Sequence, residues 1–135
     1  MTAPDTRILI ANNHPLIRRG LIDLLRIEYP RAVFGEAGNG KAAITTALGD
    51  DWDVVIVGSS LRDTNGIGVI KAIKAVKPAV PIVLTSWFPT PLEVLHAQNA
   101  GASAYVVEPD AGEELAGALR AVLAGGRYFF SDGAK

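Results

Sequence analysis

Polar residues follow four short apolar runs of this chain, at the point where each run ends. They are Asn12 and Asn13, then Ser59 and Ser60 behind Gly58, then Thr85, and finally Glu108. If these runs are strands of an open parallel sheet, their carboxyl ends line one ligand crevice, so we expect these side chains to meet there. Such a cluster has the outline of a phosphoryl-and-metal site. It holds a single carboxylate, however, and that mismatch decides how the chain is interpreted.

The composition of the chain limits the classes of protein to which it can belong. Its 135 residues, of which 49% are hydrophobic, fit one globular domain with a substantial core. The 13 basic and 14 acidic residues give a formal charge of -1, so the charge balance favours neither DNA nor an anionic membrane as a partner. There is no cysteine, which excludes disulfides and cysteine zinc sites. We see no signal peptide and no apolar run long enough to span a bilayer, and we expect a cytoplasmic protein.

Apolar runs alternate with helix-like stretches along the chain. The predicted strands cover residues 7–11, 32–37, 53–57, 81–85 and 103–107. The predicted helices start at residue 15 and stop before Pro30, and then cover residues 40–49, 66–76, 92–100 and 112–124. Leu16, Leu21 and Leu25 recur at helical spacing and predict one apolar face for the first helix. Gly101 is predicted to end the fourth helix as a left-handed cap.

This alternation predicts a parallel sheet with right-handed crossovers and helices on both faces. Five strands favour a flavodoxin-like (βα)5 fold, an α/β three-layer sandwich with strand order 2-1-3-4-5. We see no linker, repeat or low-complexity segment. Residues 1–135 are therefore predicted to form a single domain with its core between residues 7 and 130.

Several stretches of the chain resemble the receiver domain of bacterial two-component response regulators. They cover residues 7–20 (RILIANNHPLIRRG), 35–40 (GEAGNG), 52–57 (WDVVIV), 101–105 (GASAY) and 124–128 (AGGRY). The likeness is to the NarL/FixJ branch, also called LuxR-type, and it extends over nearly the whole chain in the right order. Receivers of this branch usually precede a helix-turn-helix domain. The chain is therefore either this domain alone or the N-terminal part of a longer regulator with a C-terminal helix-turn-helix.

The resemblance also assigns roles to single positions. It places the Mg²⁺-holding acidic pair at Asn12 and Asn13, the phosphoacceptor aspartate at Gly58, the phosphoryl-contacting lysine at Glu108, and the retained hydroxyl and aromatic switch residues at Thr85 and Tyr105. The first four of these positions have lost the side chain that the role requires. Only the two switch positions follow the pattern of the family.

These replacements remove the chemistry of the site. Phosphoryl transfer to a receiver needs a carboxylate nucleophile, and Gly58 has no side chain. Mg²⁺ is usually held by carboxylates, for which the amides of Asn12 and Asn13 are poor substitutes. Glu108 would repel a phosphoryl group where a lysine attracts it. We therefore predict a degenerate receiver that accepts no phosphate at Gly58 and uses neither a metal nor another cofactor.

Two motifs could also be interpreted as phosphate-handling sites. Residues 35–42 nearly match a phosphate-binding P-loop, but Ala42 replaces the hydroxyl that would ligate Mg²⁺, so we predict a turn and a helix cap instead. Asp63 could serve as a displaced phosphoacceptor. We predict that it is a solvated loop acid ahead of the Asn65–Gly66 turn.

Three residues near the crevice keep two interpretations each. Trp87 and Phe88 follow the fourth predicted strand, where aromatic residues often form a contact surface, but at least one of the rings could cover the edge of the core instead. Thr85 either satisfies a local backbone group or hydrogen-bonds a ligand beside the two amides.

We predict a signalling domain that is not an enzyme: an atypical, phosphorylation-independent receiver of a LuxR-type transcriptional regulator. It would act by contact with a protein partner or a second copy of itself. The resemblance implies contact faces built from the first and last helices, or from the fourth helix and fifth strand. DNA would be bound only by a C-terminal domain outside this chain, and no membrane is involved. Two alternatives stay open, a small-molecule-sensing pseudo-receiver that uses the crevice and a receiver phosphorylated at a non-standard residue.

Overall fold

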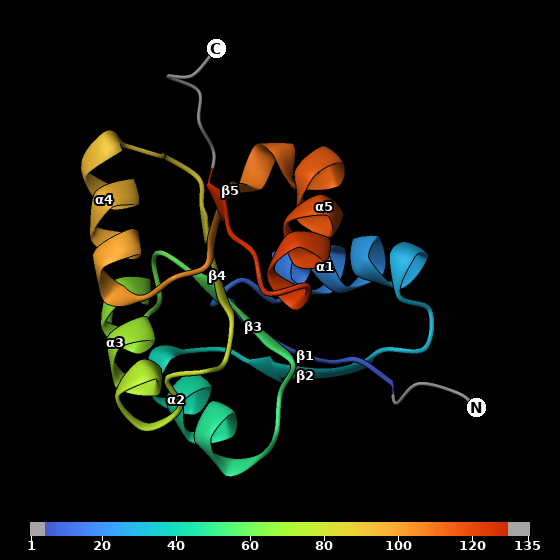
Figure 1. The fold of residues 1–135 in the computed structure, drawn as a ribbon, viewed down its shortest axis with the longest axis horizontal. Coiled ribbons are helices and arrows are strands. Elements are labelled where there is room, and N and C mark those ends of the chain that lie inside the picture. The colour runs from blue at the N-terminus through green and yellow to red at the C-terminus, as the bar shows by residue number, and fades with distance from the viewer. Residues whose placement is uncertain (1–4, 130–135) are drawn as a thin grey trace.

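A computed structural model describes residues 5–129 and shows a six-stranded parallel sheet (Figure 1). The strands are β1 (Arg7–Ala11), β2 (Val33–Ala37), β3 (Val54–Gly58), β4 (Ile82–Ser86), β5 (Ala104–Val107) and β6 (Tyr128–Phe129). Their spatial order is β2-β1-β3-β4-β5-β6, and every neighbouring pair is parallel. The flavodoxin-like fold and the order 2-1-3-4-5 are therefore confirmed.

Five α-helices cover the two faces of this sheet. They are α1 (Pro15–Glu28), α2 (Gly40–Gly49), α3 (Gly66–Val76), α4 (Pro91–Ala100) and α5 (Ala111–Leu123), with a 3-10 turn, η1 (Glu108–Asp110), just before α5. Figure 1 shows α1 and α5 together on one face and α2, α3 and α4 on the other. Within the described residues, no helix has both the length and the apolar character needed to cross a membrane.

The core lies in two layers, one on each face of the sheet, because successive side chains of a strand point to opposite faces. On β3, Val55 and Val57 pack in the layer under α2, α3 and α4, while Val54 and Ile56 pack in the layer under α1 and α5. All four side chains are fully buried. A buried side chain of this size stabilises the fold by about 1.5–3 kcal/mol, so β3 contributes substantially to both layers.

The helix starts follow local capping chemistry. Asn39 and Asn65 each accept a hydrogen bond from the N–H group three residues later, at 2.8 Å in both cases. Such a cap contributes about 1 kcal/mol. Residues 35–42 are thus a strand, a turn and a capped helix, as predicted in place of a P-loop. Gly101 ends α4 with a φ of 107°, which confirms the left-handed cap.

Two predictions about the elements are wrong. The short β6, whose Tyr128 and Phe129 pair with the start of β5, follows the last helix and was not predicted. Leu16 does not join the apolar face of α1, since it is 84% exposed. A separation of five residues turns Leu16 by roughly 140° around the helix from the buried Leu21. Phe130, the predicted last core residue, lies outside the described part of the chain.

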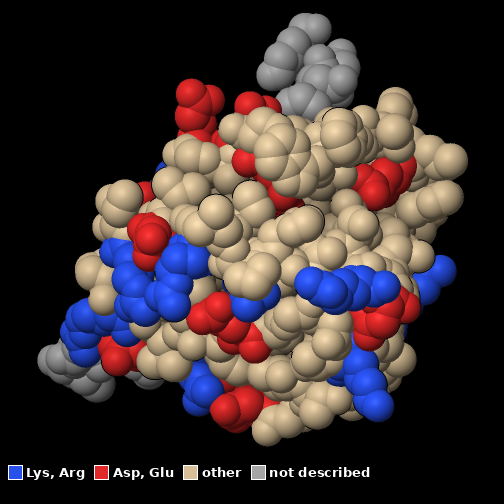
Figure 2. Space-filling view, turned by 180° about the vertical axis from the view of Figure 1, so that it is seen from behind, with Lys and Arg blue, Asp and Glu red and all other residues tan. Residues whose placement is uncertain are grey.

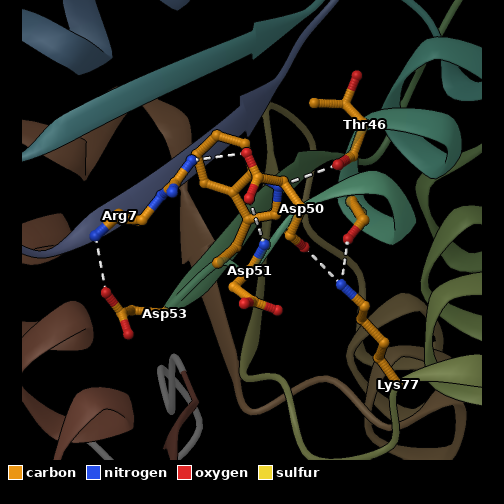
Figure 3. Close-up of polar contacts among 8 residues, drawn as sticks. Arg7, Thr46, Asp50, Asp51, Asp53 and Lys77 are labelled. Atoms are coloured by element: carbon orange, nitrogen blue, oxygen red, sulfur yellow. Dashed lines mark hydrogen bonds and ion pairs between the residues drawn. The ribbon is translucent and has the colours of Figure 1, made fainter.

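A polar network lies at the amino ends of the strands (Figure 3). The backbone N–H of Arg7, at the start of β1, donates to the Asp53 carboxylate at 2.7 Å, and the Arg7 guanidinium pairs with Asp50 at 2.8 Å. Lys77, just after α3, donates to the backbone carbonyl groups of Ala47 and Asp50. These bonds hold the loop between α2 and β3, and they lie at the edge of the sheet opposite the predicted crevice.

Candidate functional site

A cavity of about 350 Å³ opens at the carboxyl ends of the strands. Its lining comes from four strand ends and from α4: Asn12, Asn13, His14, Gly58, Ser59, Ser60, Ser86, Trp87, Phe88, Glu93 and Glu108. The expected meeting of the polar residues behind β1, β3, β4 and β5 is therefore confirmed. A volume of this size falls within the range of roughly 300–1,000 Å³ that is typical of small-molecule sites.

Glu108 is the polar centre of the cavity wall. Its Oε2 accepts a hydrogen bond from the Thr85 hydroxyl at 2.9 Å and another from the Asn12 amide at 3.3 Å. Burial raises the pKa of the Glu108 carboxyl, while the bonds from Thr85 and Asn12 and the nearby His14 lower it in part. The Thr85 hydroxyl donates to a side chain and not to a local backbone group, so the first interpretation of Thr85 is wrong, while a bond to a ligand stays a prediction.

Asn12 is held at both ends of its amide. Its Oδ1 accepts the backbone N–H of His14 at 2.8 Å, and its Nδ2 donates to Glu108. Only 4% of Asn12 is exposed. His14 itself precedes the first residue of α1 and makes no side-chain cap. Both amide ends of Asn12 are thus engaged within the protein. Asn12 and the half-buried Asn13 beside it both line the cavity.

Gly58 lies at the end of β3 with ordinary space around it. A Cβ placed there would lie 3.4 Å from the Asn12 amide nitrogen and 3.5 Å from the Ala11 carbonyl oxygen, which is normal contact. Gly66 differs, since its Cβ would lie 2.4 Å from the carbonyl oxygen of Gly58 and 2.7 Å from Leu84. The fold therefore requires glycine at position 66 and tolerates a side chain at position 58.

A second carboxylate in the cavity, Glu93, was not predicted. It lies in the first turn of α4 and accepts a hydrogen bond from the hydroxyl of Tyr105, whose ring is fully buried in β5. Burial and the bond to Glu93 raise the pKa of Tyr105 well above its usual range. The run Thr90-Pro-Leu-Glu93 matches the capping-box pattern, in which the glutamate reaches back to the cap. That signal identifies Glu93, but it indicates the wrong partner for it.

The two aromatic residues form the outer lip of the cavity. The ring centroids of Trp87 and Phe88 lie 6.5 Å apart at an interplanar angle of 42°. Trp87 is 49% exposed and Phe88 is 84% exposed, and neither belongs to the core layers. Both rings thus lie at the surface, and their use as a contact surface stays a prediction.

Asp63 lies outside the cavity. Its carboxylate accepts the backbone N–H groups of Gly40 and Lys41, at 2.7 and 3.0 Å, at the start of α2. These bonds lower the pKa of Asp63. The loop acid predicted from the sequence is thus exposed, but it has a structural task, which is to bind the free N–H groups of a helix terminus.

The residues present do not fit the divalent cation that a receiver of this fold implies. Mg²⁺ asks for carboxylate ligands, and the positions at the ends of β1 and β3 offer two amides and a glycine. Across residues 5–129, no group of three His, Cys, Asp or Glu side chains gathers to hold a metal. These residues therefore do not supply a magnesium site.

Comparison with known proteins gives one consistent family. The model of the response regulator receiver domain matches residues 8–120. The nitrate/nitrite response regulator protein NarP of Escherichia coli is 28% identical over 94% of this chain and 59% of its own length. The DNA-binding transcriptional activator DevR/DosR of Mycobacterium tuberculosis is 33% identical over 88% of this chain and 55% of its own length. The chain thus spans little more than half the length of these curated relatives.

The same likeness extends to solved structures. A LuxR-family two-component response regulator from Aurantimonas superposes with a TM-score of 0.90 and 29% identity, covering 97% of this chain and 94% of that one. A CheY-like receiver domain protein from Methanospirillum hungatei superposes with a TM-score of 0.83 at 17% identity, covering 90% and 96% of the two chains, and shows the fold alone.

Proposed function

Because this chain belongs to the response regulator receiver domain family, in its NarL/LuxR-type branch, we propose that it is an atypical receiver that signals without phosphorylation. One observation carries the proposal: the hydroxyl of Thr85 is already bonded to the carboxylate of Glu108, beside a strand end that has no carboxylate nucleophile. A side chain of the protein thus occupies the retained hydroxyl. Control would then come from expression level, a partner or a bound ligand.

The proposed output is contact with a protein, either a partner or a second copy of this chain, and no catalysis. The segment from Trp87 to Leu95 supports this, because it exposes a run of apolar side chains. Phe88 is 84% exposed, Leu92 60% and Leu95 50%. On α1 the exposed apolar residues Leu16 and Ile27 lie at opposite ends of the helix, so α4 offers the better contact face.

In this proposal the domain works in the cytoplasm as part of a transcriptional regulator, and DNA is bound by a C-terminal domain outside this chain. Acidic and basic side chains lie next to one another over the face drawn in Figure 2, which supports no nucleic-acid surface there. Two of the related proteins are named as a response regulator protein and a DNA-binding activator, which supports the assignment to transcription.

The test is incubation with acetyl phosphate, followed by intact mass. The proposal expects no gain of a phosphoryl group by the natural chain. A reconstructed variant that combines Gly58→Asp, Asn13→Asp and Glu108→Lys is the positive control, because it restores a nucleophile, a metal-binding carboxylate and a lysine. An acyl phosphate or phosphoserine on the natural chain would overturn the proposal in favour of a non-standard phosphoacceptor, and peptide mapping would name the residue.

A second candidate function is a small-molecule-sensing pseudo-receiver. The observation in its favour is the cavity of about 350 Å³, lined by amides, hydroxyls, carboxylates and two aromatic rings. A panel of metabolites screened by thermal melting separates the two candidates. A sensor shows a concentration-dependent rise in melting temperature with one class of compound, and a pure interaction module shows none.

A further inference from the structure

The charge of the cavity indicates what it could bind. Two carboxylates, Glu93 and Glu108, belong to the lining, whereas no lysine or arginine does. His14 is the only basic side chain among the lining residues. A phosphoryl group or another anion would therefore meet net negative charge, and a cation would be attracted.

Both carboxylates keep an oxygen free to accept from a ligand. The protein occupies Oε2 of Glu108 through Thr85 and Asn12, and Oε1 of Glu93 through Tyr105. Among the hydrogen bonds of the described residues, none ends on Oε1 of Glu108 or on Oε2 of Glu93. An N–H donor that carries a positive charge forms the strongest bonds to such oxygens.

The lip of the cavity adds aromatic surface to this charge. The rings of Trp87 and Phe88 stand 6.5 Å apart in a tilted arrangement and are both open to solvent. Aromatic faces attract cations and stack on flat apolar groups, and Trp is the most favourable ring for a cation. Carboxylates inside and aromatic rings outside suit a ligand with a charged head and an apolar body.

We propose that this cavity binds a small organic cation, an amine or guanidinium attached to a flat apolar group. The charged head lies between Glu93 and Glu108, and the apolar body lies against Trp87 and Phe88. This inference deepens the proposed function, since it rests on a crevice that takes no phosphoryl group. A metal ion is the weaker occupant, because within residues 5–129 no third acidic or histidine ligand joins the two carboxylates.

The position of the two carboxylates gives such binding a route into the fold. Glu108 is the acceptor for Thr85 on β4, and Glu93 is the acceptor for Tyr105 on β5. These are the two switch positions that the sequence retains. A cation shared by the free oxygens of both carboxylates would link the first turn of α4 to the end of β5. Binding would therefore affect α4, the helix that carries the exposed side chains of Leu92 and Leu95.

The test is a titration followed by NMR of the two tryptophan indole N–H groups. Trp87 lines the cavity, whereas Trp52 donates its indole N–H to the Thr46 carbonyl group at the far edge of the sheet and serves as the internal control. The probes are 2-phenylethylamine, 2-phenylethanol and 3-phenylpropionate, which share a ring and differ in charge. We expect the amine to move the Trp87 signal in a saturable way, with Trp52 unchanged, and the alcohol and the acid to act only at far higher concentration.

Variants decide whether the two carboxylates are responsible. Glu93→Gln and Glu108→Gln should each weaken binding of the amine about tenfold or more, because each removes a charge-assisted bond. Glu113→Gln, an exposed change in the first turn of α5, is the matched control and should titrate like the natural chain. Phe88→Ala alters a side chain that is 84% exposed, so it should weaken binding without affecting the fold.

Several outcomes would overturn the inference. They are equal shifts with all three probes, no saturable shift with the amine, natural affinity in both glutamine variants, or a larger Trp87 response to Mg²⁺ than to the amine. None of these results touches the acetyl phosphate experiment, in which a phosphorylated natural chain would instead defeat the proposed function. The two proposals can thus fail separately.

Discussion

The hydroxyl of Tyr105 donates a hydrogen bond to the carboxylate of Glu93, which joins a fully buried ring of β5 to the first turn of α4. The same helix fully buries only two small side chains, Ala97 and Ala100, and Val94 packs against the core in part. Little apolar packing therefore holds α4 on the sheet, and a single polar contact at its start carries unusual weight. The stability and position of α4 should depend on this bond more than those of the other helices do.

Replacing Tyr105 with phenylalanine should destabilise the protein by about 0.5–1.5 kcal/mol, because the ring stays buried while the bond to Glu93 is lost. The free energy of unfolding in urea measures the effect. Tyr128→Phe is the matched control, since the Tyr128 hydroxyl bonds Glu114 at 3.1 Å from a half-buried site. A loss for Tyr105→Phe no larger than that of the control would contradict the role given to the bond.

Glu108 should make stability depend on pH in the range above the ordinary carboxyl pKa of 4.5. Burial raises the pKa of Glu108, so the folded state holds a proton that the unfolded state releases. Stability then falls as the pH rises from about that ordinary value through the raised pKa. Glu108→Gln should show a flatter profile over this window, as measured by urea unfolding at a series of pH values. Parallel profiles for the two proteins would refute the assignment.

Gly66 and Gly112 should respond in opposite directions to alanine. At Gly66 the added Cβ would meet the Gly58 carbonyl oxygen at 2.4 Å, so Gly66→Ala should cost about 1–3 kcal/mol. At Gly112, within α5, the added Cβ would meet no atom within 4 Å outside the backbone of its own helix. Gly112→Ala should therefore stabilise the protein by about 0.4–1 kcal/mol. Thermal melting of both variants checks the pair. Equal effects would mean that the close approach of α3 to the end of β3 is wrong.

Self-association should depend on α4. Leu92→Ser and Leu95→Ser remove exposed apolar side chains and should weaken a homodimer about tenfold each, if they lie near the centre of its interface. Sedimentation velocity over a range of concentrations measures the change. Val76→Ser, at the end of α3, is a control with similar exposure, 62%. Weakening by Ile27→Ser alone would move the interface to α1.

Most of the fold follows from sequence because the signals are local and repeated. The helix over residues 66–76 is predicted to the residue, since Asn65 supplies its cap and Pro78 closes the stretch behind it. The buried run of β3 is equally clear. By contrast, β6 has only two residues, and its pairing with β5 depends on tertiary contacts that leave no periodic pattern in the sequence.

The candidate site is predictable in outline and not in detail. That the polar strand ends meet is a consequence of parallel topology, which the sequence reveals. The partners of each side chain are set by geometry between elements far apart in the chain, such as Thr85 with Glu108 and Tyr105 with Glu93. The capping-box pattern points to Glu93 but not to its partner, because the bond from Tyr105 is a tertiary contact that the local pattern does not contain.

The ordinary space around Gly58 has a consequence for substitutions at this position. Its neighbours leave room for a side chain, and the structure records a positive φ only at Gly101 and Gly125 among the glycines of the described part. An added Cβ at position 58 would thus be accommodated by the backbone. An aspartate placed there would still face the carboxylate of Glu108 and the amides of Asn12 and Asn13, so Gly58→Asp alone should supply a carboxylate without making the domain a phosphoacceptor.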